Sequence, residues 1–390
     1  MGKVKLGIIG VGNMGSGHVD NIKKGLIPNV ELTAICDVDP KKIENIKSKV
    51  SENVQFFSDS KDLIRSGLVD AILVATPHYF HPIIAIDGFN NGLHVLIEKP
   101  AGVFTKAVRE MNEVAEKSDK IFGIMYNQRT NPAYQKLKEM LENGDLGEMV
   151  RTIWIITDWY RTQSYYNSGG WRATWSGEGG GVLINQDPHQ LDLMQWICGV
   201  PKRVRASCYF GKYHDIEVED DVTAYFEYAN GATGLFVTTT GEYPGTNRFE
   251  VSGDKGKVVI EHGKFTWYKN NGSVKEFTFN SKEGFANIGT KAEDLTFNGG
   301  GEQHVGILNN FCDAILTGAK LLAPGKEGIN GLTVSNAIHM SAWTDNWVDV
   351  PFDEEKYIKL LNERISNSKV KKDLSGTSMV ADLGGTYNSK

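Results

Sequence analysis

The stretch VKLGIIGVGNMG, residues 4–15, starts as an apolar run and ends in the glycine pattern GxGxxG. Glycine clusters occur in many turns, so the pattern alone is weak. Here it follows a predicted strand and opens a predicted helix, and Asp37 ends the next apolar run. The acid lies 37 − 15 = 22 residues after the third glycine, close to the interval of about 20 that is typical of dinucleotide-binding βαβ units.

Each position of this loop has a physical task in such a unit. Gly10 permits the tight turn, Gly12 lets a pyrophosphate approach the backbone, and Gly15 lets the helix pack closely on the strand. The helix would open at Asn13 and Met14, where free N–H groups and the positive end of the helix dipole favour a phosphate.

Asp37 is the predicted ligand of the adenosine ribose, because a carboxylate accepts hydrogen bonds from its hydroxyls and repels a 2′-phosphate. No arginine follows it, since the chain continues Val38-Asp39-Pro40. The cofactor is therefore expected to be NAD rather than NADP. Two alternatives stay open at this point: a structural glycine turn with an ordinary surface aspartate, and a methyltransferase loop that binds S-adenosylmethionine.

The composition excludes several classes of protein. With 390 residues, 40% of them hydrophobic, the chain predicts a globular protein of two domains. The net charge of −6 argues against nucleic acid or an anionic membrane as its main partner. No apolar run approaches the roughly 20 residues of a membrane span, and we expect no signal peptide. The four cysteines are scattered, which favours a reducing cytoplasm, and we predict no metal site.

The first part of the chain alternates apolar runs with amphipathic helical stretches, which predicts a Rossmann-type, doubly wound parallel sheet covered by helices on both faces. We place this NAD-binding domain at residues 1–127. The predicted strands are residues 4–10, 31–37, 70–76, 94–98 and 121–126.

The texture changes after about residue 150. Residues 221–241 alternate apolar and polar residues around an Asn-Gly pair, which predicts a hairpin within a large, mostly antiparallel sheet. We assign residues 128–366 to an α+β domain for substrate binding and oligomerisation, whose final helices pack back on the first domain. Residues 367–390 are polar and are expected to form a C-terminal arm.

Two predicted strands end in reactive sequences, ATPHYFHP at residues 75–82 and IEKPAG at residues 97–102. Ligands of open parallel sheets bind at the carboxyl ends of the strands. A partly desolvated Lys99 beside a cationic nicotinamide would have a lowered pKa and could exchange protons. The alternative is a surface ion pair between Glu98 and a neighbouring residue, with Lys99 simply solvated. The residues predicted to contact the cofactor here are Thr76, Pro77, His78, His81, Glu98, Lys99 and Asn127.

These motifs, followed by a β-rich half that holds a histidine in NQDPHQLDL, resemble the Gfo/Idh/MocA oxidoreductases over nearly the whole chain. Within that family the chain is similar to glucose–fructose oxidoreductase and inositol dehydrogenase. The resemblance implies an NAD(P)-dependent sugar or cyclitol oxidoreductase. It also implies that Lys99 lies in the active site, that Pro100 follows a cis bond, and that His189 accepts a proton.

The start of the helix around His189 has two interpretations. Asp187 could be its N-cap with Pro188 in the first position, so that the positive helix end keeps His189 neutral. If the helix starts near Gly181 instead, Asn185 and His189 share one face. Many members of the resembled family carry Asp where this chain has Asn185. The change removes a charge and leaves hydrogen bonding to substrate as the role we assign to that residue.

Residues 154–175 contain four of the eight tryptophans and three tyrosines, interleaved with Arg, Ser and Gly. Such a segment suits a pocket that offers flat apolar faces to a sugar ring and donors to its hydroxyls. An oligomer interface has a similar composition and is the alternative. The predicted substrate-binding residues are Tyr160, Trp171, Arg172 and Asn185.

The function expected from these residues is the reversible oxidation of a secondary alcohol of a sugar, sugar derivative or cyclitol. His189 would take the hydroxyl proton and Lys99 would polarise the oxygen and relay the proton. Two alternatives stay open: an enzyme that cleaves glycosides through a transient redox step, and a non-enzymatic regulator that senses the dinucleotide. We expect a homodimer or homotetramer.

Overall fold

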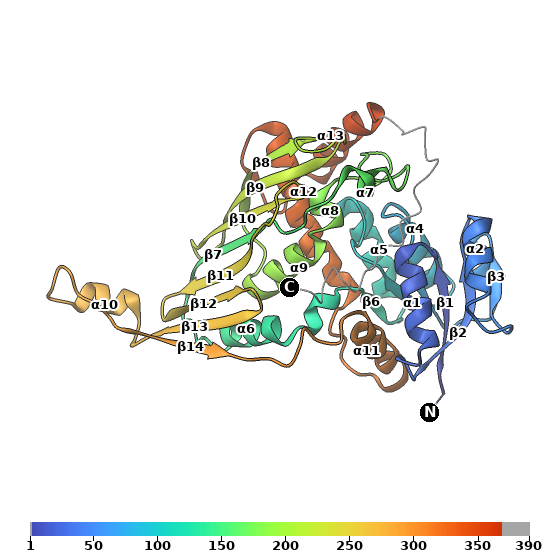
Figure 1. Cartoon of the computed structure of the whole chain (residues 1–390), viewed down its shortest axis with the longest axis horizontal. Coiled ribbons are helices and arrows are strands. Elements are labelled where there is room, and N and C mark those ends of the chain that lie inside the picture. Colours follow the sequence, from blue (N-terminus) through green and yellow to red (C-terminus); the bar gives the residue numbers. More distant parts are fainter. Residues whose placement is uncertain (1, 369–390) are drawn as a thin grey trace.

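The structure, a computed structural model, describes residues 2–368 and contains two sheets (Figure 1). The predicted arm at residues 367–390 lies outside the described residues from 369 onward. No helix in the described part of the chain is long and apolar enough to cross a membrane.

The first sheet has six parallel strands in the order β3-β2-β1-β4-β5-β6, the order of a doubly wound dinucleotide fold. Its strands are β1 (Val4–Ile9), β2 (Val30–Cys36), β3 (Gln55–Phe57), β4 (Ala71–Val74), β5 (His94–Ile97) and β6 (Phe122–Ile124). The helices between them are α1 (Asn13–Lys23), α2 (Pro40–Lys47), α3 (Ser60–Ile64), α4 (Phe80–Asn90) and α5 (Thr105–Lys117). All four residues of β4 are buried, as expected for a strand covered on both faces. The fold prediction for this half is confirmed.

The second sheet has nine strands in the order β14-β13-β12-β11-β7-β10-β9-β8-β15, and only β7 and β10 pair in parallel. Along β9, Val222, Ala224 and Phe226 are buried while Thr223 and Tyr225 are exposed, so one face is covered. The strands are β7 (Met149–Ile156), β8 (Arg203–Phe210), β9 (Glu219–Glu227), β10 (Thr233–Thr239), β11 (Asn247–Gly253), β12 (Gly256–Glu261), β13 (Lys264–Asn270), β14 (Thr290–Leu295) and β15 (Val348–Asp349).

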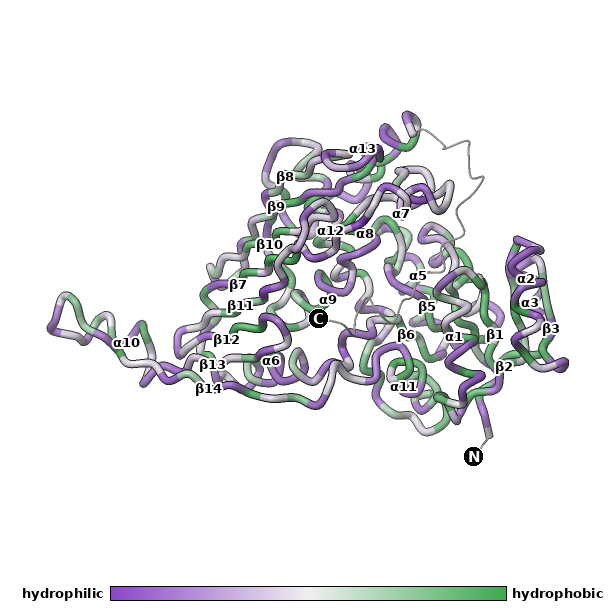
Figure 2. Tube along the Cα trace, viewed as in Figure 1, coloured by the Kyte–Doolittle hydropathy of each residue, from purple (hydrophilic) through white to green (hydrophobic). Residues whose placement is uncertain are grey.

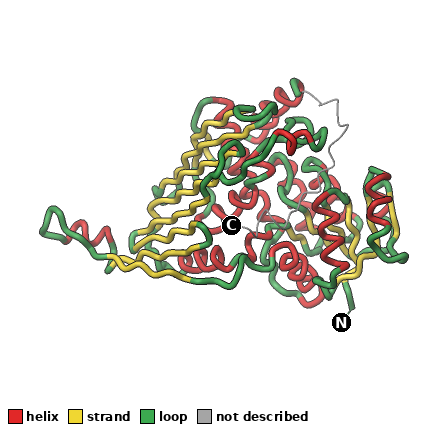
Figure 3. Tube along the Cα trace, in the orientation of Figure 1, coloured by secondary structure: helices red, strands yellow, loops and turns green. Residues whose placement is uncertain are grey.

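The helices of the second half lie mainly on the side of the large sheet that faces the first sheet (Figure 3). They are η1 (Asn127–Thr130), α6 (Pro132–Glu142), α7 (Gln163–Asn167), α8 (Val182–Asn185), α9 (Pro188–Cys198), α11 (Gln303–Thr317), η2 (Gly325–Glu327), α12 (Gly328–Thr344) and α13 (Glu354–Ser366), while α10 (Val274–Asn280) sits on the hairpin of β13 and β14. The hairpin projects from the body (Figure 1).

Helix α11 returns to the first half of the chain. Its Ile307, Leu308 and Phe311 belong to the same apolar core as the strands of the first sheet. Asn29 also donates a hydrogen bond of 2.9 Å to the Asp313 carboxylate. Figure 2 shows hydrophobic residues along α11 and hydrophilic residues along the outer helix α2. The two halves are therefore packed together, and the proposed domain boundaries stay a prediction.

A buried arginine links three segments behind the strand ends. Arg129 of η1 is fully buried and donates to both carboxylate oxygens of Asp192 in α9, at 2.8 and 2.7 Å. It also donates to Glu327 of η2 at 2.5 Å. Burial alone would lower the pKa of the Arg129 guanidinium, but the two carboxylates outweigh it and raise that pKa above its usual range. A bidentate pair of this kind fixes both position and orientation.

We predict that Arg129→Met lowers the free energy of unfolding by about 3–5 kcal/mol, because Asp192 would be left buried without its cation. The matched control is Arg109→Met on the surface of α5, where the paired arginine is 46% exposed and the loss should stay below about 1 kcal/mol. Urea unfolding of both variants measures the difference. Equal losses would contradict the structural role of Arg129.

Candidate active site

Steric contacts explain two glycines of the loop after β1. Gly10 has φ +93°, and a Cβ there would lie 2.5 Å from the Ala75 carbonyl oxygen. A Cβ on Gly15 would lie 1.9 Å from the carbonyl oxygen of Gly10. Neither position accepts a side chain, so α1 can pack against the strand ends only with glycine at both.

Gly12 is different, because a Cβ on it would meet no atom within 4 Å. Its backbone borders open space rather than a packed contact. Helix α1 starts at the next residue, and no side chain caps its N-terminus. The N–H groups around Asn13 and Met14 are therefore available to an anion, and a pyrophosphate fits this cradle.

Asp37 is tied to the glycine loop. Its Oδ2 accepts a hydrogen bond of 2.8 Å from Val11 N, and its Oδ1 accepts one of 2.9 Å from Asp39 N. The Asp37 side chain is 5% exposed and holds the tip of β2 beside the loop. Sequence reasoning overlooked Lys42, whose Nζ lies 3.7 Å from the same carboxylate. Each carboxylate oxygen retains a lone pair that a ribose hydroxyl could use.

His81 connects the ends of β4 and β5, the two strands that end in the reactive sequences. Its Nδ1 lies 2.7 Å from the carbonyl oxygen of Pro100, and its Nε2 lies 2.7 Å from that of Thr76, which Pro77 follows. His78 connects the same region to the second half of the chain, with its Nδ1 3.1 Å from the Glu178 carbonyl oxygen. These contacts hold both strand ends against the loop before α8.

Lys99 crosses between the two halves. Its Nζ donates a hydrogen bond of 2.7 Å to the carbonyl oxygen of Asn185, the last residue of α8. Burial lowers the pKa of the Lys99 amine, although the negative charge of Glu98 opposes the shift. The Lys99–Pro100 bond is cis, as the resemblance implied.

Glu98 does not form the surface ion pair that was the alternative. Its carboxylate is buried, and its Oε1 lies 2.6 Å from Nε2 of His18 in α1. The ring of His304 lies edge-on to His18, with 5.7 Å between the ring centroids. Burial lowers the pKa of His304 to about 4, so this imidazole is neutral at pH 7. Sequence reasoning missed His18 and His304 because each is isolated in the sequence.

His189 occupies the first turn of α9, which begins at Pro188 with Asp187 in the N-cap position. The first interpretation of this helix start is therefore correct, and Asn185 ends a separate short helix. The Asp187 side chain nevertheless makes no capping hydrogen bond. Burial lowers the pKa of His189 well below its ordinary value, and the positive charge of Lys99 lowers it further. His189 is thus a neutral imidazole within electrostatic reach of the Lys99 amine.

A hydrogen-bonded network surrounds Asn185. The Tyr165 hydroxyl lies 3.1 Å from Nδ2 of Asn185 and accepts a hydrogen bond of 3.0 Å from Arg172. The guanidinium of Arg172 lies over the Trp171 ring, 4.7 Å from its centroid. Glu178 accepts from the same Asn185 amide. Tyr165 and Glu178 were not predicted as site residues, although Tyr165 lies in the aromatic segment that the sequence analysis singled out.

Parts of the aromatic segment have other roles. Tyr160 is 45% exposed and packs on Tyr243, so Tyr165 rather than Tyr160 takes part in the network. Trp154 is buried in β7 and stacks on Phe249, with 4.2 Å between the ring centroids. The segment is thus partly core, and its composition alone overstates the pocket.

Two buried polar atoms support a ligand at the strand ends. The hydroxyl of Thr76 and Oδ1 of Asn127 are buried, and neither has a hydrogen-bond partner within residues 2–368. The Asn127 amide nitrogen is held by Gln303 at 2.8 Å. Buried polar atoms normally find partners, and the hydroxyl and amide groups of a dinucleotide would supply them.

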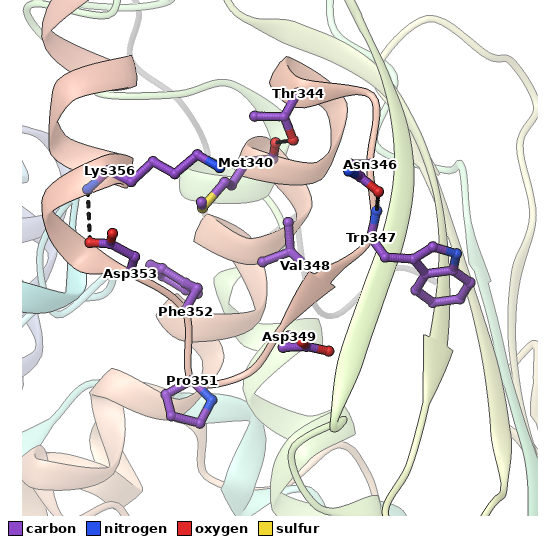
Figure 4. A pocket seen from close by; sticks show the side chains of 10 residues that line it. All are labelled: Met340, Thr344, Asn346, Trp347, Val348, Asp349, Pro351, Phe352, Asp353 and Lys356. Atoms are coloured by element: carbon purple, nitrogen blue, oxygen red, sulfur yellow. Dashed lines mark hydrogen bonds between the residues drawn. The ribbon is translucent and has the colours of Figure 1, made fainter.

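A separate hollow of about 360 Å³ lies at the C-terminal end of the described chain (Figure 4). Figure 4 shows side chains from the end of α12, β15 and the start of α13 around it. It shares none of the strand-end residues and is not the candidate site. The lining residues are Met340, Thr344, Asn346, Trp347, Val348, Asp349, Pro351, Phe352, Asp353 and Lys356.

Comparison with known proteins agrees with this architecture. The chain is 29% identical over 199 residues to the rhizopine catabolism protein MocA of Rhizobium meliloti, across 51% of this chain and 58% of that protein. It is 26% identical over 279 residues to myo-inositol 2-dehydrogenase of Thermotoga maritima, across 67% and 77% of the two chains.

A solved structure aligns over most of the chain. The WlbA dehydrogenase from Bordetella pertussis, in complex with NADH and UDP-GlcNAcA, has a TM-score of 0.74 and 25% identity, covering 90% of this chain and 100% of that one. Residues 4–126 match the family model described as oxidoreductase family, NAD-binding Rossmann fold, and residues 134–259 match the model of the GFO/IDH/MocA C-terminal domain. The chain therefore belongs to the Gfo/Idh/MocA family of oxidoreductases.

Proposed function

We propose that this chain is an NAD-dependent dehydrogenase that oxidises a secondary alcohol of a sugar, sugar derivative or cyclitol. The observation that carries the proposal is the hydrogen bond from Lys99 at the end of β5 to the carbonyl of Asn185, which lies four residues before His189 in the chain. It brings an amine with a lowered pKa to the segment that holds a neutral imidazole. Such a pair can exchange a proton with a substrate hydroxyl.

The chain's own residues would prepare the hydroxyl for oxidation. A bound nicotinamide would accept the hydride. His189, neutral at pH 7, would accept the hydroxyl proton, and Lys99 would donate a hydrogen bond to the oxygen as negative charge develops there. Buried donors of this kind stabilise that charge more strongly than water does.

The substrate class rests on the network around Asn185 and on the relatives. The Trp171 ring offers an apolar face, while Arg172, Tyr165 and Asn185 offer hydrogen-bonding groups, a combination suited to a polyhydroxylated ring. One of the compared proteins is named as a myo-inositol 2-dehydrogenase, and another was solved in complex with UDP-GlcNAcA. A polyol ring is the chemistry common to them.

We predict that Lys99→Met reduces turnover at least about a hundredfold, as expected for loss of a proton-handling group, and leaves NADH affinity nearly unchanged. Lys106→Met on the surface of α5 is the control. Absorbance of reduced nicotinamide across inositols, aldoses and glycosides measures turnover, and NADH fluorescence measures binding. Full turnover in Lys99→Met would contradict the proposal.

The same panel separates the alternatives. Glycoside hydrolysis without net NADH would indicate the transient redox reaction. Tight NADH binding with no turnover on any sugar would indicate a regulator.

We predict that Gly12→Val weakens NADH binding at least about tenfold, because its side chain would occupy the space proposed for the pyrophosphate. The matched control is Gly17→Val in α1, since a Cβ at either position meets no atom within 4 Å. Both variants should keep the thermal stability of the parent. Equal NADH affinity of the two variants, measured by fluorescence titration, would place the phosphates elsewhere.

We predict that the chain prefers NAD to NADP and that Asp37→Ser reduces the ratio of their kcat/KM values at least about tenfold. The change removes the negative charge that repels a 2′-phosphate. It leaves Lys42, whose Nζ lies 3.7 Å from the Asp37 carboxylate, free to attract that phosphate. Lys41→Ser, in the preceding position of α2, is the control. An unchanged ratio in Asp37→Ser would show that another residue selects the cofactor.

A further inference from the structure

Glu178 is a buried acid that has no part in the proposed proton transfer. It lies in the loop before α8, and its side chain is 2% exposed. Its Oε1 accepts a hydrogen bond of 2.5 Å from Nδ2 of Asn185, and its Oε2 accepts one of 2.6 Å from Ala173 N. Both partners are donors, so the contacts fit a carboxylate that accepts at both oxygens.

The charged groups around Glu178 come from several elements. Arg172 lies 3.8 Å from its Oε1, and Lys99 approaches from the end of β5. The two cations lower the pKa of Glu178, whereas the negative charge of Glu219 in β9 raises it. Oε2 of Glu219 lies 3.0 Å from Nε2 of His339 in α12. His78 contacts the Glu178 carbonyl oxygen rather than its carboxyl. Burial outweighs the cations and raises the pKa of Glu178 to about 7.

The amide of Asn185 is held through its nitrogen. Nδ2 donates to Glu178 and lies 3.1 Å from the Tyr165 hydroxyl. The main chain of Asn185 is held separately, through the hydrogen bond from Lys99. Of the polar side-chain atoms of Asn185, Oδ1 is the one left to accept a hydrogen bond from a substrate hydroxyl.

We propose that Glu178 is a positioning residue that fixes the Asn185 amide with Oδ1 toward the substrate. The Asn185 amide carries no charge, and the carboxylate of Glu178 supplies a negative charge one hydrogen bond further from the substrate. The inference rests on the proposed function, because the group that Asn185 receives is a hydroxyl of the polyol.

Protonation of Glu178 reverses the direction of this hydrogen bond. Its new O–H needs an acceptor, and Ala173 N–H cannot be one. The Asn185 amide must therefore turn its Oδ1 toward Glu178, which leaves Nδ2 facing the substrate. Substrate binding then falls as the pH drops through the pKa of Glu178, so kcat/KM rises between about pH 6 and 8.

Glu178→Gln should impose the turned amide at every pH. The carbonyl oxygen of the introduced glutamine must accept from Ala173 N, so its NH₂ group faces Asn185 and takes Oδ1. We expect kcat/KM at pH 8 to fall about tenfold, mainly through KM. The rise of kcat/KM near pH 7 should disappear. Glu250→Gln is the matched control, because Glu250 of β11 also accepts through both oxygens but lies far along the chain from the strand ends, between the cations Arg248 and Lys257.

The double variant Glu178→Gln with Asn185→Asp separates positioning from a merely structural role. One oxygen of the new carboxylate can accept from the NH₂ group of the introduced glutamine, and the other can accept from the substrate. We expect kcat/KM to return to within about threefold of the parent value. Glu178→Gln with an unchanged pH profile, or a double variant no better than the single one, would overturn the inference.

A measurement without turnover keeps this test independent of the proposed function. The infrared carboxyl band of the whole protein, compared with that of Glu178→Gln, should contain one component that titrates near pH 7. Absence of that component would overturn the inference even in an active enzyme. If the component is present but the protein oxidises no sugar, the ionisation of Glu178 is supported and only the proposed function is refuted.

Discussion

The hydrogen bond from Lys99 Nζ to the Asn185 carbonyl is the contact on which the account of the site depends. Its two residues are 86 positions apart and come from the two halves of the chain, each built on its own sheet. Burial lowers the pKa of both the Lys99 amine and the His189 imidazole, and the positive charge of Lys99 lowers that of His189 further. A charge from the first half of the chain thus adds to burial in keeping the imidazole of the second half neutral.

Close packing around the strand ends makes that contact possible. Gly10 and Gly15 bring α1 against the strands at distances that no side chain would permit. The His81 ring lies between the Thr76 and Pro100 carbonyl oxygens, 2.7 Å from each, and thereby connects the two strand ends. The bidentate pair of Arg129 with Asp192 holds α9, the helix that contains His189, against η1. Rigid elements of this kind place reacting groups more accurately than loops do.

Most of the fold could be predicted from the sequence because its signals are local. Apolar runs, the glycine pattern and the Asn-Gly hairpin each lie within a few residues of the element they predict. The exception in the first sheet is β3, a three-residue edge strand whose two phenylalanines are flanked by polar residues, whereas the three residues of β6 lie in a longer apolar run. The site was predicted less well. Tyr165 and Glu178 acquire their roles from Asn185 through contacts that a linear reading does not contain. Tyr160 and Trp154 lie in the same aromatic segment, yet Tyr160 is exposed and Trp154 is buried in the core.

The decisive experiment is a crystal structure of the chain with NADH and an inositol or aldose that it turns over. We expect one substrate hydroxyl to lie within hydrogen-bond distance of both Lys99 Nζ and an imidazole nitrogen of His189, with its carbon against the nicotinamide ring. A sugar bound with that hydroxyl away from either nitrogen, or a nicotinamide directed away from the end of β5, would contradict it.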